Sequence, residues 1–199
     1  MNRLGLLADR RIAALLAAET ISTTGSEMSW LALPWFVLAT TGSPMQMGFV
    51  VAATVAGAAL LGLPGGSALA KLGTRGTLLV ADACRAPLVL AVPLLHWTGG
   101  LSYPLLLGLV FAEGAFAGPY FAAQRVIVPE LLGEEEEVVG RANALLQGAT
   151  RITLLLGPAA AGVLIAWIGA ASVLVIDAAT FGISFLLVGL LILPVPPAE

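Results

Sequence analysis

The sequence has 199 residues, of which 59% are hydrophobic and only 11% are charged, and its formal net charge is −3. A soluble domain carries about a quarter charged residues, so this chain has too little charge to cover a water-facing surface of its size. Together with a mean hydropathy of +0.99, this composition excludes a soluble enzyme and a disordered chain.

Charges and turn residues divide the sequence into six apolar stretches, each long enough for a membrane-spanning helix of about 20 residues. In chain order these stretches are 12–39, 48–70, 77–97, 101–128, 142–168 and 173–193. They are continuously apolar, whereas the strands of a membrane barrel alternate over about ten residues. The sequence therefore predicts an all-α membrane protein with a six-helix bundle over residues 12–193.

Basic residues predict how this bundle is oriented. Lys and Arg precede the first stretch and occur at the second and fourth connections, but the connections at 41–47, 98–102 and 169–172 contain none. Basic residues favour the cytoplasmic side of a membrane. We therefore expect a multi-pass protein of the plasma membrane with both termini in the cytoplasm and residues 1–11 as a cytoplasmic segment.

The second half of the sequence repeats features of the first. The matching pairs, 96 residues apart, are Gly66 and Gly162, Ala70 and Ala166, Gly73 and Gly169, and Leu78 and Leu174, followed after one residue of slippage by Asp82 and Asp177. Units of three helices have odd length, so the second unit enters the membrane from the opposite side. The pattern predicts a 3+3 inverted repeat, typical of secondary transporters, with chance similarity in a chain rich in Gly, Ala and Leu as the alternative.

Four ionisable residues lie deep within the apolar stretches, namely Glu19, Glu27, Glu113 and Arg151. A charge at mid-membrane costs roughly 2.5–3.5 kcal/mol on insertion scales, so these side chains must face a wet cavity or one another. A carboxyl group removed from water favours its protonated form. The three glutamates are therefore candidates for proton or substrate contact, with Arg151 as a counter-charge. Purely structural pairing of Arg151 with one glutamate is the alternative.

Other polar residues have simpler explanations. Asp82 and Arg85 lie three residues apart on one helical face and can form a structural ion pair near the cytoplasmic end of the third helix. Asp177 lies near the opposite end of the sixth helix and is expected to reach the interface. The acidic run at 134–137 fits a solvated loop better than a cation site.

The sequence offers little for enzymatic chemistry. Cys84 and His96 are each the only residue of their type, which excludes an internal disulfide and metal motifs built on paired cysteines or histidines. There is no phosphate-binding Gly-Lys-Ser/Thr loop, and the basic residues form no patch for nucleic acid. We expect no enzymatic activity, no catalytic residue, no metal, no cofactor and no nucleic-acid partner.

Four stretches carry a resemblance to a known family. They are Ser22–Gly25 with Ala32-Leu33-Pro34 and Thr41-Gly42-Ser43, then Gly65–Arg75, then Arg141–Leu145, and finally Gly157–Gly162. With these four stretches in this order and spacing, the chain resembles the amino-terminal six-helix half of a major facilitator superfamily transporter. Within that family, the resemblance is closest to the macrolide-efflux and enterobactin-export proteins. The resemblance implies conformational roles for two groups of residues. These residues are Gly66, Lys71, Gly73, Arg75, Asp82 and Arg85 in the first, and Gly157, Pro158 and Gly162 in the second.

Two residues depart from the pattern of that family. Ala70 stands where the family's loop usually has an Asp that helps to latch the outward-facing state, and Val110 stands where many drug antiporters carry an Arg. The resemblance also implies that the first and fourth helices line the substrate cavity. This would place Glu19, Glu27 and Glu113 on the cavity wall, with the second and fifth helices facing another half.

These observations predict a secondary transporter that exports a bulky, partly apolar small molecule by proton-coupled alternating access. The expected partners are membrane lipid, the small-molecule substrate, and a second six-helix half or a second copy of the chain. Residues 194–199 would begin the central linker between the halves. The alternative is a non-transporting membrane scaffold or a degenerate transporter fragment, which the short length, Ala70 and Val110 favour.

Overall fold

The computed structural model describes residues 9–62, 65–133 and 135–192, and within this part the chain forms six helices and no strand. The helices are α2 (Arg10–Thr41), α3 (Pro44–Gly62), α4 (Gly65–Trp97), α5 (Tyr103–Leu132), α6 (Glu136–Ile168) and α7 (Ala170–Leu191). The all-helical class predicted from the sequence is confirmed. Residues 1–8 of the predicted cytoplasmic segment and the predicted linker at 194–199 lie outside the described residues.

Within the described residues, four helical segments are long and apolar enough, by length and composition, to cross a membrane. They are Leu69–Trp97, Tyr103–Leu132, Glu136–Ile168 and Ala170–Leu191. The apolar part of α3, Pro44–Leu60, is shorter, and α2 carries four ionisable residues along its 32 residues. The helical membrane character follows from these segments, while the count of six spans stays a prediction.

Helix α3 is shorter than the expected span over 48–70. It ends at Gly62, and the next helix begins at Gly65. The sequence at this point explains the difference, because Pro64 has no amide hydrogen to donate to the preceding turn and Gly65 and Gly66 weaken a helix. A second interruption lies at Gly73, whose φ of 69° and ψ of 170° break α4 inside the predicted turn at 71–76. Glycine adopts that positive φ readily.

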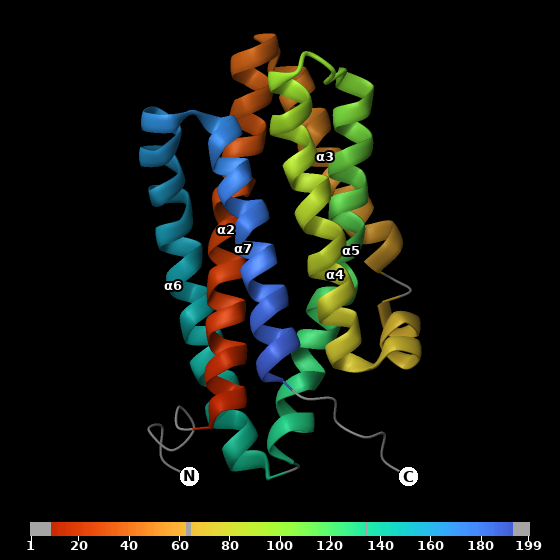
Figure 1. Cartoon of the computed structure of the whole chain (residues 1–199), viewed down its shortest axis with the longest axis vertical. Helices are drawn as coiled ribbons and strands as arrows, with labels where there is room; N and C mark the ends of the chain where they lie inside the picture. Colours follow the sequence, from red (N-terminus) through yellow and green to blue (C-terminus); the bar gives the residue numbers. More distant parts are fainter. Residues whose placement is uncertain (1–8, 63–64, 134, 193–199) are drawn as a thin grey trace.

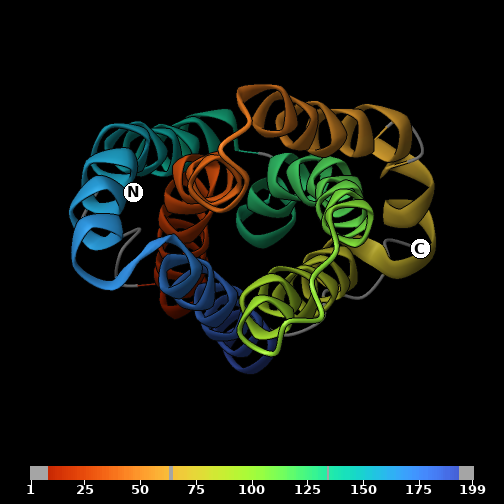
Figure 2. The same ribbon diagram turned by 90° about the horizontal axis from the view of Figure 1, so that it is seen from above.

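The helices pack in two groups of three (Figures 1 and 2). Helix α2 lies against α6 and α7, and helix α5 lies against α3 and α4. The groups meet chiefly where α4 faces α7, whereas α2 and α5 touch only slightly. The start of α2, the break in α4 and the α5–α6 turn lie at the same end of the bundle (Figure 1). Lys and Arg occur at every other connection between the helices. This pattern predicts that these three segments lie on the same side of the membrane.

A band of polar side chains divides the core into two apolar clusters. One cluster includes Leu15, Leu78, Ile127 and Val188, and the other includes Val37, Val89, Val110 and Phe181. The polar side chains occur between the clusters along the helices, and those that are buried include Glu19, Ser22, Asp82, Arg85, Asp177 and Ser184. Three helices, α2, α4 and α7, thus bring polar groups to a similar depth, where water cannot easily reach them.

Glycines set the closest approach between α3 and α5. A Cβ atom on Gly114 would collide with the backbone carbonyl of Thr54, and one on Gly57 would collide with that of Phe111. Small residues let helix backbones approach closely in membranes. The reciprocal contacts fix the α3–α5 pair along one side of the bundle.

We therefore expect Gly114→Ala to destabilise the protein by about 1–3 kcal/mol, because the added methyl must push two backbones apart. Gly108→Ala is the matched control on the same helix, since a Cβ there meets nothing within 4 Å. Thermal unfolding in detergent measures both. Equal melting temperatures for the two variants would contradict the close packing of α3 on α5.

Candidate functional site

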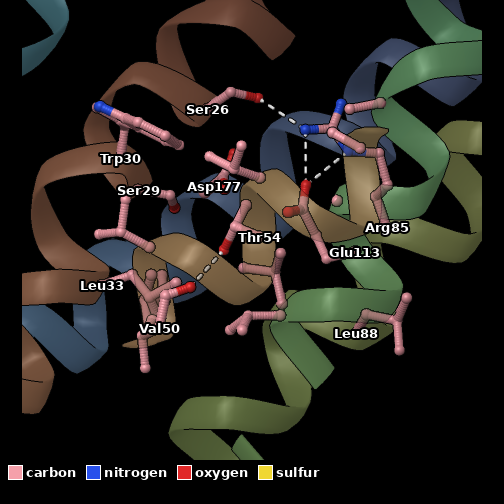
Figure 3. Close-up of a pocket in the computed structure, with 18 of the residues that line it drawn as sticks. Ser26, Ser29, Trp30, Leu33, Val50, Thr54, Arg85, Leu88, Glu113 and Asp177 are labelled. Atoms are coloured by element: carbon pink, nitrogen blue, oxygen red, sulfur yellow. Dashed lines mark hydrogen bonds and ion pairs between the residues drawn. The ribbon is translucent and has the colours of Figure 1, made fainter. Parts of the chain in front are cut away.

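A cavity of about 500 Å³ lies among the six helices (Figure 3). Its walls are mostly apolar, from Val50 and Val55 on α3 to Leu154 on α6 and Leu174 on α7. The polar groups that line it are Ser26, Glu27, Ser29, Thr54, Arg85, Glu113 and Asp177. A largely apolar cavity with a few polar groups is the usual form of a small-molecule site.

The strongest polar contact in the cavity joins α4 to α5. Arg85 donates to Oε1 of Glu113 from Nε at 2.8 Å and from Nη2 at 2.7 Å. The two side chains are 9% and 17% exposed, so little water screens them. A further donor contact runs from Arg85 Nη2 to Ser26 Oγ on α2, at 3.4 Å. Removing one partner of such a buried pair typically costs about 3–5 kcal/mol.

Aromatic rings also hold the guanidinium of Arg85. Its Cζ lies 4.2 Å from the ring centroid of Phe181 on α7 and 5.9 Å from that of Tyr120 on α5. A cation over an aromatic face is stabilised most where water is excluded. The position of Arg85 is therefore set by α2, α5 and α7 together.

Asp177 corrects an expectation from the sequence. It was expected to reach the membrane interface, but it is 1% exposed and lines the cavity beside Arg85. The reason is its position on the buried face of α7, between Leu174 and Phe181, which turns the side chain inward. Its Oδ1 accepts a long hydrogen bond from Thr180 Oγ1, at 3.4 Å, and lies against Gly25 of α2.

The predicted ion pair between Asp82 and Arg85 is wrong. Both carboxylate oxygens of Asp82 are buried without a hydrogen-bond partner, and Arg85 is directed to Glu113 instead. The long arginine side chain reaches the carboxylate of a neighbouring helix, while Asp82 faces α7, where the hydroxyl of Ser184 lies near it. Asp82 and Arg85 remain within electrostatic range of each other.

Glu27 lines the cavity from α2, as predicted, and it is half-buried. Among the described residues, its carboxylate has no hydrogen bond or ion pair. Gly157 on α6 packs directly against its stem, because a Cβ added to Gly157 would lie 2.6 Å from the Cβ of Glu27. The glycine predicted to permit a close helix approach thus positions one of the predicted site glutamates.

The structure does not bring Glu19 or Arg151 to the cavity wall. Glu19 is 5% exposed and buried away from the cavity, with Oε1 unpartnered. Arg151 is exposed on the outer face of α6, and no ion pair within the described part of the chain reaches it. The alternative, a structural pairing of Arg151 with a glutamate, is not seen among the described residues, because Arg151 lies on an exposed face of α6.

The predicted conformational loop makes contacts at the ends of two other helices. Arg75 donates to the backbone carbonyls of Ile192 at 2.5 Å and Gly189 at 2.7 Å. These carbonyls belong to the last turn of α7, where intrahelical partners are lacking and a positive charge is favoured. Thr74 Oγ1 donates to Glu130 of α5, at 2.5 Å. The loop thus ties α4 to α5 and α7.

The remaining predicted conformational residues make fewer contacts. Lys71 is exposed, and Gly66 lies in the first turn of α4. Pro158 lies inside α6, as the sequence predicts, but Gly162 is exposed and a Cβ there would meet nothing within 4 Å. Nothing in the sequence marked Ser26 and Phe181 as neighbours of Arg85, or Thr54 as part of the cavity lining. Asp177 could have been found as the repeat partner of the buried Asp82.

Comparisons with known proteins agree on a family. The sequence profile of the Major Facilitator Superfamily matches residues 15–199. The multidrug efflux pump Tap of Mycobacterium tuberculosis (strain H37Rv) is 31% identical over 180 residues, which cover 89% of this chain and 43% of the relative. An uncharacterised MFS-type transporter of Sinorhizobium fredii is 29% identical over 159 residues, covering 78% of this chain and 38% of that protein. The chain spans less than half the length of these relatives, and no solved structure gives a significant match.

We expect Arg75→Gln to lower the stability of the protein by about 1–3 kcal/mol, since two carbonyls at the end of α7 lose a charged donor. Lys71→Gln is the control from the same loop and should change stability by no more than about 0.5 kcal/mol. Thermal unfolding measures both, and hydrogen exchange at the end of α7 localises the effect. Equal exchange in Arg75→Gln and the parent would contradict the capping role.

Proposed function

The chain belongs to the major facilitator superfamily, and we propose that it is a module of a proton-coupled exporter for a bulky, partly apolar small molecule. The observation that carries this proposal is the cavity of about 500 Å³, whose apolar walls hold the buried ion pair of Arg85 with Glu113 and two further carboxyl groups, those of Glu27 and Asp177. The similarity to proteins named multidrug efflux pumps supports export rather than uptake.

The helix contacts support a 3+3 inverted repeat. If α2, α3 and α4 correspond to α5, α6 and α7, the contact of α2 with α6 corresponds to that of α5 with α3. Both contacts depend on a glycine of the outer helix against the inner one, Gly157 of α6 against Glu27 of α2 and Gly57 of α3 against Phe111 of α5. The contacts of α2 with α7 and of α5 with α4 correspond in the same way. This arrangement suits rocking of one unit against another during alternating access.

A second six-helix half, or a second copy of the chain, would complete the cavity in this proposal. Helices α3 and α6 lie along the same side of the bundle (Figure 2), and both expose large apolar side chains. These include Phe49 and Leu60 on α3 and Leu155, Leu156 and Trp167 on α6. The position of α3 and α6 agrees with the expectation that the second and fifth helices face another half.

Two cavity carboxylates take different roles in the proposal. Glu27 carries an unpaired carboxylate among apolar side chains and is proposed to contact the substrate. Glu113 is proposed to take up a proton, which weakens its bond to Arg85 by removing the negative charge. In this proposal Glu19 serves only as a buried proton-binding group outside the cavity. Arg151 has no role in the proposed function. The membrane is proposed to be the plasma membrane, with both termini of the chain in the cytoplasm, as the distribution of basic residues predicts.

The proposal is tested by drug efflux from cells that lack their own exporters. We expect the protein, produced with whatever follows residue 199 in its gene, to lower the accumulation of an apolar fluorescent dye. A protonophore should abolish the effect. Absence of any efflux in a correctly inserted protein would favour the non-transporting scaffold, the alternative that Ala70 and Val110 suggest.

Glu113→Gln should reduce proton-driven efflux at least about tenfold, because its side chain can no longer exchange a proton. Glu27→Gln should raise the KM for the substrate more than it lowers kcat, since it removes a binding contact. Glu136→Gln, an exposed glutamate at the start of α6, is the control and should leave both parameters unchanged. An unaltered pH profile in Glu113→Gln would remove this residue from proton coupling.

A further inference from the structure

The polar centre of the cavity holds more negative than positive groups. Arg85 supplies one guanidinium, and two carboxyl groups from different helices face it, Glu113 on α5 and Asp177 on α7. Charges inside a membrane protein are stable only when they are paired or neutralised. One guanidinium can balance one carboxylate, so the other carboxyl group must hold a proton while the site is dry.

Arg85 has the donors needed for a second carboxylate. Its Nε and Nη2 donate to Glu113 and Ser26, whereas Nη1 donates to no acceptor among the described residues. A guanidinium carries five N–H donors in a planar fork. Asp177 and Phe181 lie four residues apart on one face of α7, and the ring of Phe181 already packs on the guanidinium. Figure 3 shows Asp177 beside Arg85 and Glu113.

We propose that Asp177 is the second carboxylate partner of Arg85, and that the guanidinium exchanges Glu113 for Asp177 during the transport cycle. The inference rests on the proposed function and assigns Asp177 a positioning role within it. In the state described here, Glu113 is ionised and bound to Arg85, and Asp177 holds a proton. In the exchanged state, Asp177 is ionised and bound, and Glu113 holds a proton.

The exchange balances in atoms and charge. The O–H bond of Asp177 breaks and its proton leaves the site, while an O–H bond forms on Glu113 with a proton that enters. No electron changes place, and the net charge of the site is the same before and after the exchange. Each exchange therefore takes up one proton on Glu113 and releases one from Asp177, and the guanidinium has one carboxylate partner in both states.

The two partners of Arg85 belong to different groups of helices. Helices α4 and α5 lie in the same group, so the bond to Glu113 acts within it, whereas α7 lies in the other group. Moving Arg85 to Asp177 would replace a bond inside one group by a bond between the groups. Proton exchange would then alter how tightly α4 is held to α7, where the two groups meet.

Other titratable groups around Arg85 fit the role less well. Asp82 is on the same helix as Arg85, so pairing with it would not change any contact between helices, and it lies toward Ser184. Glu27 on α2 lines the cavity but makes no contact with Arg85. Tyr120 on α5 contributes its ring face to Arg85. Asp177 alone among these carboxyl groups combines another helix with an adjoining ring contact.

A double-mutant cycle on the purified full chain tests the exchange. Glu113→Gln and Asp177→Asn should each lower the melting temperature modestly, because Arg85 keeps one carboxylate partner in either variant. The double variant should lose roughly 5 °C or more beyond the sum of the single shifts. Additive shifts would overturn the inference. Glu113→Gln combined with Asp82→Asn is the control and should be additive, and excess loss there would assign the second partner to Asp82.

Infrared spectroscopy keeps the inference testable if the double variant does not fold. Asp177→Asn should remove a carbonyl band of a protonated carboxyl group from the parent spectrum. Glu113→Gln should remove the same band, because Arg85 then binds Asp177 and ionises it. Persistence of the band in Glu113→Gln would overturn the exchange.

The outcomes separate this inference from the proposed function. Proton-driven efflux with an additive cycle would reject the exchange and leave the transporter proposal intact. A non-additive cycle without any proton-driven efflux would reject proton-coupled transport, and the exchange as a step of transport with it.

Discussion

The charge of Arg85 imposes the strictest requirement on this fold. A guanidinium buried among apolar helices needs a carboxylate within hydrogen-bonding distance, and Glu113 supplies it at 2.7 Å. Ser26 of α2, Phe181 of α7 and Tyr120 of α5 complete the surroundings of the guanidinium. The helices that carry these residues must therefore keep their relative depth, which aligns the polar band between the two apolar clusters. Membrane helices gain little from hydrophobic burial against each other, so this polar centre gives the bundle much of its specificity.

Backbone approach determines where the cavity can lie. Gly114 brings α5 against α3, and Gly157 brings α6 against α2. Each close contact draws an outer helix onto an inner one, while α2 and α5 hardly touch. The space left between α2 and α5 is closed by α4 and α7. Side chains of α2 line it on one side, and side chains of α5 line it on the other. The same small residues that tighten the pairs thus leave room for the cavity, and Gly157 also sets the position of Glu27 on its wall.

Composition and spacing were sufficient to predict the helical class and the approximate helices, because these depend on local apolar length. The family was identified from the resemblance of four short stretches to a known pattern. Depth along the sequence also pointed to Glu27 and Glu113, which line the cavity, since a carboxyl group deep in an apolar stretch needs a wet cavity or a polar partner. Composition and spacing failed where the answer depends on which helix lies opposite. Asp82 and Arg85 share a helical face in the sequence, but Arg85 binds a carboxylate of α5. Arg151 lies as deep as the glutamates along its helix, yet the rotation of α6 turns it outward. Depth can be counted along a sequence, whereas the direction of a side chain depends on packing.

The contacts of the loop after Gly73 bear on how movement could pass through the bundle. Ala70 stands where the loop of the resembled family usually has an Asp. Arg75 of the same loop donates to the last carbonyls of α7, so this contact lies inside the six-helix bundle. Helices α4 and α7 are therefore joined at one end by Arg75 and in the middle by Arg85 against Phe181. Two helices fixed at one end can change their relation only by pivoting about that end. A change in the partner of Arg85 would act halfway along α4 and α7. Because the two helices are held together at the Arg75 end, a small rotation there displaces their opposite ends by a larger distance.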